Sequence, residues 1–161
     1  MLHLSVDATG EIVSQVLTDS GVDDGTTWVT IIGVVSEPVR SVVADAAYDT
    51  RPIYDAAGSM QAEVVVPSTS NASTSTRRRR SKSRNRTVKR VNELGRPRWK
   101  KESGYHRQAR VENTFVRYKT VFGGRLLDRS LSAQEAEAAV ARTVLNRMRE
   151  LGWRNSEKVV R

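Results

Sequence analysis

The sequence predicts an α/β fold, and three features of its first half support this prediction. Two short, continuously apolar runs, Arg40–Ala44 and Ala62–Val66, are typical of buried strands. Between them, Asp49–Pro52 carries a helix start signal with Pro in the first turn. An alternating stretch, 2–17, precedes both runs. Buried strands separated by helical segments favour a sheet that is covered by helices.

The first half divides into elements at its turn and cap residues. The alternating stretch predicts a β-hairpin that turns at Asp7–Gly10. Thr26–Val35 then predicts a short apolar helix, with Asp23 or Asp24 in a position to cap it. The helix between the two buried strands is expected to continue toward Gly58.

The middle of the chain is strongly basic. Ser, Thr and Asn dominate from Ser68 to Thr76, and Arg77–Lys101 then holds 13 of the 27 basic residues and a single acid. Segments so charged and so poor in apolar residues rarely pack a core. We therefore expect one domain over residues 1–161, with 68–104 as a basic, flexible loop inside it.

Two helices are expected after this loop. The first covers roughly His106–Phe122 and ends at a pair of glycines. The second begins with a capping box, Ser132–Glu135, and ends near Gly152. Its predicted buried face consists of Ala136, Val140, Thr143, Val144 and Met148.

Charge is distributed unevenly along the chain. The net charge is +9, but residues 1–76 hold two basic and ten acidic side chains, whereas 77–161 hold 25 basic and eight acidic ones. A basic half of this kind usually meets a polyanion, most often nucleic acid. Zero cysteines exclude thiolate metal sites, and two histidines argue against a histidine-rich one. No secretory signal or membrane-spanning run is visible, so a cytoplasmic protein is the default expectation.

Two carboxylates stand out as candidate functional groups. Asp45 follows the first buried strand, at the edge where α/β sheets place ligand and catalytic groups, although it could also merely cap the next turn. Glu112 lies in a basic helix, with Tyr105 seven residues before it and Lys119 seven after it, so that all three share one stripe. A solvated Glu paired with a nearby Arg is the alternative interpretation.

These residues carry a resemblance to a known family. The stretch VVADAAYDT, 42–50, resembles the block that holds the second catalytic Asp of DDE transposases of bacterial insertion sequences. Tyr105, Gln108, Glu112 and Lys119 resemble the family's Y-x2-R-x3-E-x6-K signature. The hairpin sequence resembles the second and third strands of the family's catalytic domain, and the likeness covers nearly the whole chain.

The resemblance implies an RNase H-like mixed sheet flanked by helices, and metal-dependent DNA cleavage and strand transfer during transposition. Asp45 and Glu112 would be catalytic residues that ligate Mg²⁺ or Mn²⁺, in a two-metal site expected only in the complete enzyme. The partner would be double-stranded DNA, both transposon ends and target. The residues expected to contact DNA are Tyr105, Arg107, Gln108, Arg110, Lys119, Arg77, Arg78, Arg79, Arg80, Lys82 and Arg84.

Two departures from the family pattern bear on activity. Gln108 stands where the signature has Arg, although Arg107 and Arg110 are close by. The family's first catalytic Asp lies on a central strand before the hairpin, and Asp7, the nearest candidate, suits a structural role in the turn. The chain is therefore expected to be the carboxyl-terminal part of a truncated or split transposase, without the central strand and inactive alone. A separately encoded amino-terminal half and a homo-oligomer on DNA are further partners that this interpretation allows.

Two other classes of function remain open at this stage. The first is a non-enzymatic, basic nucleic-acid-binding protein, led by the arginine run 77–80. The second is another RNase H-like nuclease that cleaves without joining strands.

Overall fold

The amino-terminal hairpin forms as predicted. The structure is a computed structural model that describes residues 1–19, 21, 22, 24–69, 72, 74 and 82–152. Strands β1 (Leu2–Val6) and β2 (Ile12–Leu17) pair antiparallel. In the turn, Asp7 Oδ1 accepts hydrogen bonds from the Thr9 N–H at 2.8 Å, the Thr9 hydroxyl at 2.7 Å and the Glu11 N–H at 2.9 Å. Asp7 therefore has the structural role expected of it.

The second pair of strands along the chain is parallel. Strand β3 (Ser41–Val43) pairs with β4 (Glu63–Val65), and α2 (Arg51–Ser59) connects them, with Pro52 in its first turn. Helix α1 (Asp24–Gly33) starts and ends two residues earlier than predicted. It packs on α2, and side chains of both helices form one apolar cluster with those of β3 and β4. The mixed α/β arrangement is thus confirmed.

The prediction of a loop over 68–104 is wrong for its second half. Helices α3 (Lys82–Leu94) and α4 (Arg96–Glu102) occupy it. Val91 and Trp99 are buried and pack on Val65 of β4, which explains why these helices are held in place. The many charged residues of this segment are interspersed with a few apolar ones at helical spacing, and these are enough to anchor an amphipathic helix.

The last two helices exist as predicted, but the second buries a different face. A 3-10 turn, η2 (Tyr105–Gln108), leads into α5 (Ala109–Phe122), and α6 is Leu131–Glu150. The residue that caps α6 is Ser130, whose Oγ accepts from the Ala133 N–H, so the predicted capping box at Ser132 is wrong.

The predicted buried face of α6 is also wrong. Its members Ala136, Val140, Thr143, Val144 and Met148 are all exposed. The buried residues are Ala138, Ala141 and Leu145, and the last two share an apolar cluster with the hairpin and α5. On the neighbouring face, the Asn146 side chain bonds both the N–H (2.9 Å) and the C=O (3.0 Å) of Ile12. This amide pairing fixes the rotation of α6.

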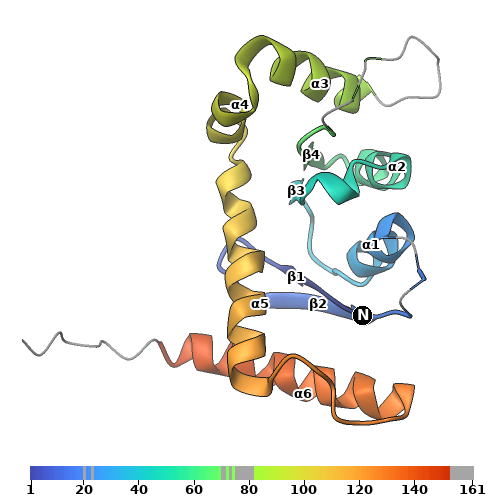
Figure 1. The fold of residues 1–161 in the computed structure, drawn as a ribbon, viewed down its shortest axis with the longest axis vertical. Coiled ribbons are helices and arrows are strands. Elements are labelled where there is room, and N and C mark those ends of the chain that lie inside the picture. The colour runs from blue at the N-terminus through green and yellow to red at the C-terminus, as the bar shows by residue number, and fades with distance from the viewer. Residues whose placement is uncertain (20, 23, 70–71, 73, 75–81, 153–161) are drawn as a thin grey trace, which may run out of the picture.

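The described strands form two separate two-stranded sheets, β1–β2 and β3–β4. Figure 1 shows the hairpin between α1 and α6, with β3 and β4 beside α2 and with α5 crossing past the hairpin. A cavity of about 530 Å³ lies between β1 and β3. The single RNase H-like sheet that the resemblance implies is therefore not formed by the described strands alone.

None of the helices formed by the described residues is long and apolar enough to cross a membrane.

Candidate metal and DNA site

Asp45 follows β3 directly and lines the cavity. Its Oδ1 accepts a hydrogen bond from the Ala47 N–H at 2.9 Å and caps the short 3-10 turn η1 (Ala46–Tyr48). The side chain is nevertheless exposed. Because a carboxylate has about four lone-pair sites, one capping bond leaves capacity for a cation. The capping role and a ligand role are thus compatible.

Glu112 lines the same cavity from α5. It lies in the first turn of α5, where the helix dipole stabilises a negative charge, and it is exposed. Burial raises the pKa of the Tyr105 hydroxyl, and the negative charges of Asp45 and Glu112 raise it further. Both carboxylates therefore act on one hydroxyl, although their elements are far apart in the sequence.

Tyr105 is held by its neighbours on α4. Its ring lies 6.0 Å from that of Trp99, centroid to centroid, and the Lys100 Nζ lies 4.9 Å from its centroid. The Tyr105 ring thus packs against Trp99, the buried residue that holds the basic segment on β4. A cation so close to an aromatic face is attracted by its quadrupole.

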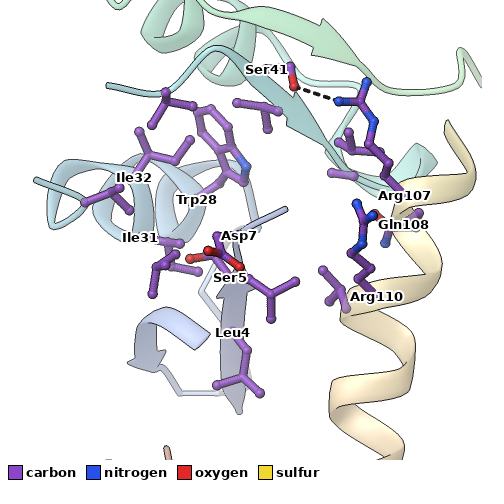
Figure 2. A pocket seen from close by; sticks show the side chains of 18 of the residues that line it. Leu4, Ser5, Asp7, Trp28, Ile31, Ile32, Ser41, Arg107, Gln108 and Arg110 are labelled. Carbon is purple, nitrogen blue, oxygen red and sulfur yellow. Dashed lines mark hydrogen bonds between the residues drawn. The ribbon is translucent and has the colours of Figure 1, made fainter. Parts of the chain in front are cut away.

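Arg107, Gln108 and Arg110 bring polar groups to the α5 side of the cavity (Figure 2). Arg107 Nη1 donates to the Ser41 hydroxyl at 3.3 Å, and its Nε donates to the Gly104 carbonyl at 3.2 Å. Gly104 has φ +73°, and a Cβ there would lie 2.8 Å from the Arg107 guanidinium. Glycine therefore lets the backbone approach this Arg. The Oε1 of Gln108 is buried and has no hydrogen-bond partner within the described part of the chain.

Lys119 is placed apart from these groups. It is exposed in the last turn of α5 and does not line the cavity. Seven residues of helix separate it from Glu112, which corresponds to about 10 Å along the axis. The structure thus brings together Asp45, Tyr105, Arg107, Gln108, Arg110 and Glu112, and leaves Lys119 farther along the same helix.

The basic helix α3 has two different faces. Lys82, Arg86 and Lys89 are exposed and follow one another at spacings of four and three residues, so they form one stripe. On another face, Arg84 shares the spacing of the buried Val88 and Val91. The arginines predicted at 77–80 lie outside the described residues.

Arg84 forms a buried ion pair that sequence reasoning missed. Its Nε and Nη2 donate to Oδ1 and Oδ2 of Asp49, each at 2.8 Å, and the Asp49 side chain is 1% exposed. Tyr54 also donates to Asp49 Oδ1, at 3.1 Å. Burial, followed by the charge of Asp49, raises the pKa of Tyr54. The structure therefore gives Arg84 a carboxylate partner inside the protein, where the sequence suggested a DNA contact.

The donor set at the cavity suits a hard cation but is small. Carboxylate oxygens are the ligands that Mg²⁺ and Mn²⁺ prefer. Across the residues that the structure describes, no three His, Cys, Asp or Glu side chains gather closely enough to hold a metal ion. Asp7 also lines the cavity, but its Oδ1 is occupied by the turn. Glu37 lines the cavity as well, and Asp45 and Glu112 are the two of these acids that the sequence motifs predict as ligands.

Comparison with known proteins adds one finding. Residues 1–147 match the family described as the transposase DDE domain. No solved structure matches the chain.

Proposed function

Because the chain belongs to the transposase DDE domain family, we propose that it serves the transposition of an insertion sequence, by DNA cleavage and strand transfer at the cavity between β1 and β3. Members of this family generally depend on divalent metal ions. The observation that carries the assignment to this site is that Asp45 and Glu112, from elements far apart in the sequence, line one cavity and both act on the Tyr105 hydroxyl.

Asp45 and Glu112 would hold Mg²⁺ or Mn²⁺ between β3 and α5. A divalent pair, when bound, supplies stabilisation of the attacking and leaving oxygens of a phosphodiester. Arg107 and Arg110 line the same cavity and would position the phosphate that is cut. Tyr105, whose pKa is raised, stays protonated at neutral pH and would donate a hydrogen bond to a phosphate oxygen.

DNA would extend from the cavity along the basic helices. The stripe of Lys82, Arg86 and Lys89 presents three cations on the exposed face of α3. Lys119 would contact the DNA backbone at the far end of α5. Each phosphate that such a residue neutralises contributes about −0.9 to the slope of log affinity against log salt.

We further propose that the isolated chain binds DNA but does not cut it. Asp7, Glu37, Asp45 and Glu112 line the cavity, but no three of the described acids gather closely enough to hold a metal ion, and fewer ligands weaken both metal affinity and the stabilisation of transition-state charge. Activity would then require a further carboxylate, supplied by another polypeptide or by a longer form of this one.

Metal binding tests the assignment of the ligands. Mn²⁺ titration of the purified chain, followed by electron paramagnetic resonance, should show a site that Asp45→Asn and Glu112→Gln each weaken at least about tenfold. Asp55→Asn is the matched control, since Asp55 is an exposed acid on α2 that pairs with Arg51. An affinity unchanged by both site variants would refute the assignment.

A nicking assay tests the proposed inactivity. The purified chain should leave supercoiled plasmid intact in Mg²⁺ and in Mn²⁺. Nicking that disappears in the Asp45→Asn variant would show that two described carboxylates are enough.

A nucleic-acid-binding protein without catalysis is the second candidate, and the exposed stripe on α3 favours it. DNA binding that is independent of metal and unchanged in Glu112→Gln would support that alternative, provided that it is lost when Lys82, Arg86 and Lys89 are replaced by Gln. Replacement is a better test than deletion of 77–101, because α3 and α4 contribute buried side chains to the core. Replacing Arg125, Arg129 and Arg147 by Gln is the control for total charge, since these three exposed residues lie away from α3, in or after the connection between α5 and α6.

A further inference from the structure

We propose that Asp49 and Arg84 are positioning residues, which together fix the place of the Asp45 carboxylate. The basic helix α3, which carries Arg84, would thereby hold a candidate metal ligand in place from inside the protein. The inference deepens the proposed function and rests on it in one respect, since Asp45 is a ligand only by that proposal. The contacts of Asp49 and Arg84 with each other and with η1 are independent of metal and of DNA.

Asp45 lies on a short arch of backbone between two points that are held. Before it, the Ala44 N–H donates to β4 at 3.4 Å. After it comes the 3-10 turn η1, in which the Tyr48 N–H donates to the Asp45 carbonyl at 3.2 Å. The Asp49 N–H donates to the Ala46 carbonyl, also at 3.2 Å, and closes the turn. Asp49 is therefore the downstream end of the arch that presents the Asp45 side chain.

The turn by itself gives little resistance to movement. It is three residues long, and 3-10 hydrogen bonds have poorer geometry than those of an α-helix. The bond from the Ala47 N–H to Asp45 Oδ1 is exposed to solvent. Tyr48 packs against the apolar cluster of α1, α2, β3 and β4, but an apolar contact has no preferred direction. The direction of the arch must therefore come from polar contacts at its ends.

The Asp49 side chain supplies such contacts. It accepts the two bonds of 2.8 Å from the Arg84 guanidinium and one of 3.1 Å from the Tyr54 hydroxyl of α2. The Thr69 N–H, in the segment after β4, donates to it at 3.4 Å. The side chain is 1% exposed, so water competes little for these bonds. Four bonds that arrive from three other segments fix both the position and the orientation of this carboxylate.

The Asp49–Arg84 pair is better explained by placement than by stability. The Arg84 side chain is 15% exposed, and its Nη1 is buried without a hydrogen-bond partner among the described residues. Burying a guanidinium with an unsatisfied nitrogen costs free energy, and replacing both members of a buried pair by apolar residues is often neutral or stabilising. An apolar pair cannot reproduce the bidentate geometry, which sets the orientation of the carboxylate as well as its distance. The pair thus suits a role in holding Asp45 in one place.

Amide hydrogen exchange measured by NMR on the full chain, without metal or DNA, tests the proposal. The Ala47 N–H reports on the Asp45 carboxylate directly, since it donates to that carboxylate at 2.9 Å. The Leu145 N–H reports on global unfolding, because it lies in α6 and the side chain of this residue is 1% exposed. A positioning role predicts a change at Ala47 alone, whereas a purely structural role predicts equal changes at both amides.

The main variant is Asp49→Leu/Arg84→Met, which leaves no buried charge without a partner and should therefore stay folded. Exchange at Ala47 should become at least about fivefold faster than in the wild type, while exchange at Leu145 should change less than about twofold. Arg51→Met is the matched control, because it breaks an exposed ion pair within α2 and should leave both amides unchanged.

A milder variant decides the matter if the double variant does not fold. Tyr54→Phe removes one of the four bonds to Asp49 and keeps the shape of the buried ring. It should accelerate exchange at Ala47 about twofold or more, with exchange at Leu145 again little changed.

Mn²⁺ titration followed by electron paramagnetic resonance gives a second readout. The double variant should bind Mn²⁺ about tenfold more weakly than the wild type, as is typical when a residue that orients a metal ligand is replaced. Arg84→Lys should lie between the two, since an ammonium keeps the charge but not the bidentate geometry.

Three results would overturn the inference. One is an unchanged exchange rate at Ala47 in both the double variant and Tyr54→Phe. The second is an equal acceleration at Leu145, which would show a role in stability alone. The third is a double variant that binds Mn²⁺ like the wild type while Asp45→Asn does not, which would leave the metal assignment standing. If the wild type binds no Mn²⁺, the metal assignment fails, and exchange at Ala47 still decides on the positioning role.

Discussion

The Asp49–Arg84 ion pair is predicted to be one of the strongest single interactions that hold the basic segment on the domain. Arg84 is the described basic residue of α3 that turns inward, and its guanidinium meets a carboxylate that is 1% exposed through two bonds of 2.8 Å. Bidentate pairs of this geometry are about twice as strong as neutral hydrogen bonds. The pair therefore connects α3 to the residues that follow Asp45.

The perturbation is Arg84→Met, which keeps an apolar stem and removes the charge. It leaves the Asp49 carboxylate buried with only the Tyr54 hydroxyl at 3.1 Å and the Thr69 N–H at 3.4 Å as remaining described partners. Removing one member of a buried pair costs about 3–5 kcal/mol, because the other charge stays desolvated. The total free energy of unfolding of a typical domain is about 5–15 kcal/mol. The variant should lose a large fraction of its free energy of unfolding.

Urea unfolding followed by circular dichroism measures this loss. Arg51→Met is the matched control, since Arg51 pairs with Asp55 at 3.1 Å but both side chains are more than 60% exposed. That variant should cost less than about 1 kcal/mol. The double variant Asp49→Leu/Arg84→Met should recover most of the lost free energy of unfolding, since it leaves no buried charge without a partner. If Arg84→Met costs no more than Arg51→Met, the anchoring role is refuted.

The remaining predictions concern packing, backbone and pH. Leu145→Ala should cost about 2–5 kcal/mol in urea unfolding, because Leu145 is 1% exposed, while Met148→Ala should change stability by less than about 0.5 kcal/mol; equal effects would contradict the observed face of α6. Gly104→Ala should destabilise the protein, and thermal unfolding should show it, because φ is +73° and a Cβ would meet the Arg107 guanidinium; an unchanged midpoint would refute this. Burial raises the pKa of Asp7, but hydrogen bonds from Thr9 and Glu11 outweigh it and lower the pKa below 3.8. The ionised Asp7 carboxylate therefore contributes to the free energy of unfolding above that pH, and this contribution is lost as the pH falls through the folded-state pKa. The stability advantage of the wild type over Asp7→Ala, measured in urea at a series of pH values, should shrink below about pH 4, and an advantage independent of pH would contradict it.

Elements with a regular apolar period were predictable from the sequence. The hairpin and the two buried strands were found where alternation and apolar runs indicated them, because residues of these types have few other ways to satisfy backbone and side chain together. The Asx turn at Asp7 follows from local chemistry alone. Such features depend on neighbours in the sequence.

The misses depend on tertiary contacts. Helix α3 looked too charged to pack, but Val91 packs on Val65 of β4, a contact that only the fold creates. For α6, the larger apolar residues suggested a buried face, but Ala141 and Leu145 are the side chains that pack on the hairpin. The motif spacing singled out Asp45 and Glu112, which both line the cavity and stay predicted ligands, whereas the partner of Arg84 required the fold. A second acid four residues after Asp45 was the signal available for it.

The contact between Ile12 and Asn146 has a consequence for how the protein is made. The two residues are 134 positions apart in the sequence, yet the amide of one helix completes the hydrogen bonding of a strand near the amino terminus. During translation the hairpin emerges long before α6, so its apolar side stays uncovered until the intervening residues and α6 have been synthesised. Contacts between such distant residues slow folding and prolong the exposure of nascent strands. Helix α6 therefore covers the hairpin late in folding, and a chain interrupted between the two would leave the hairpin uncovered.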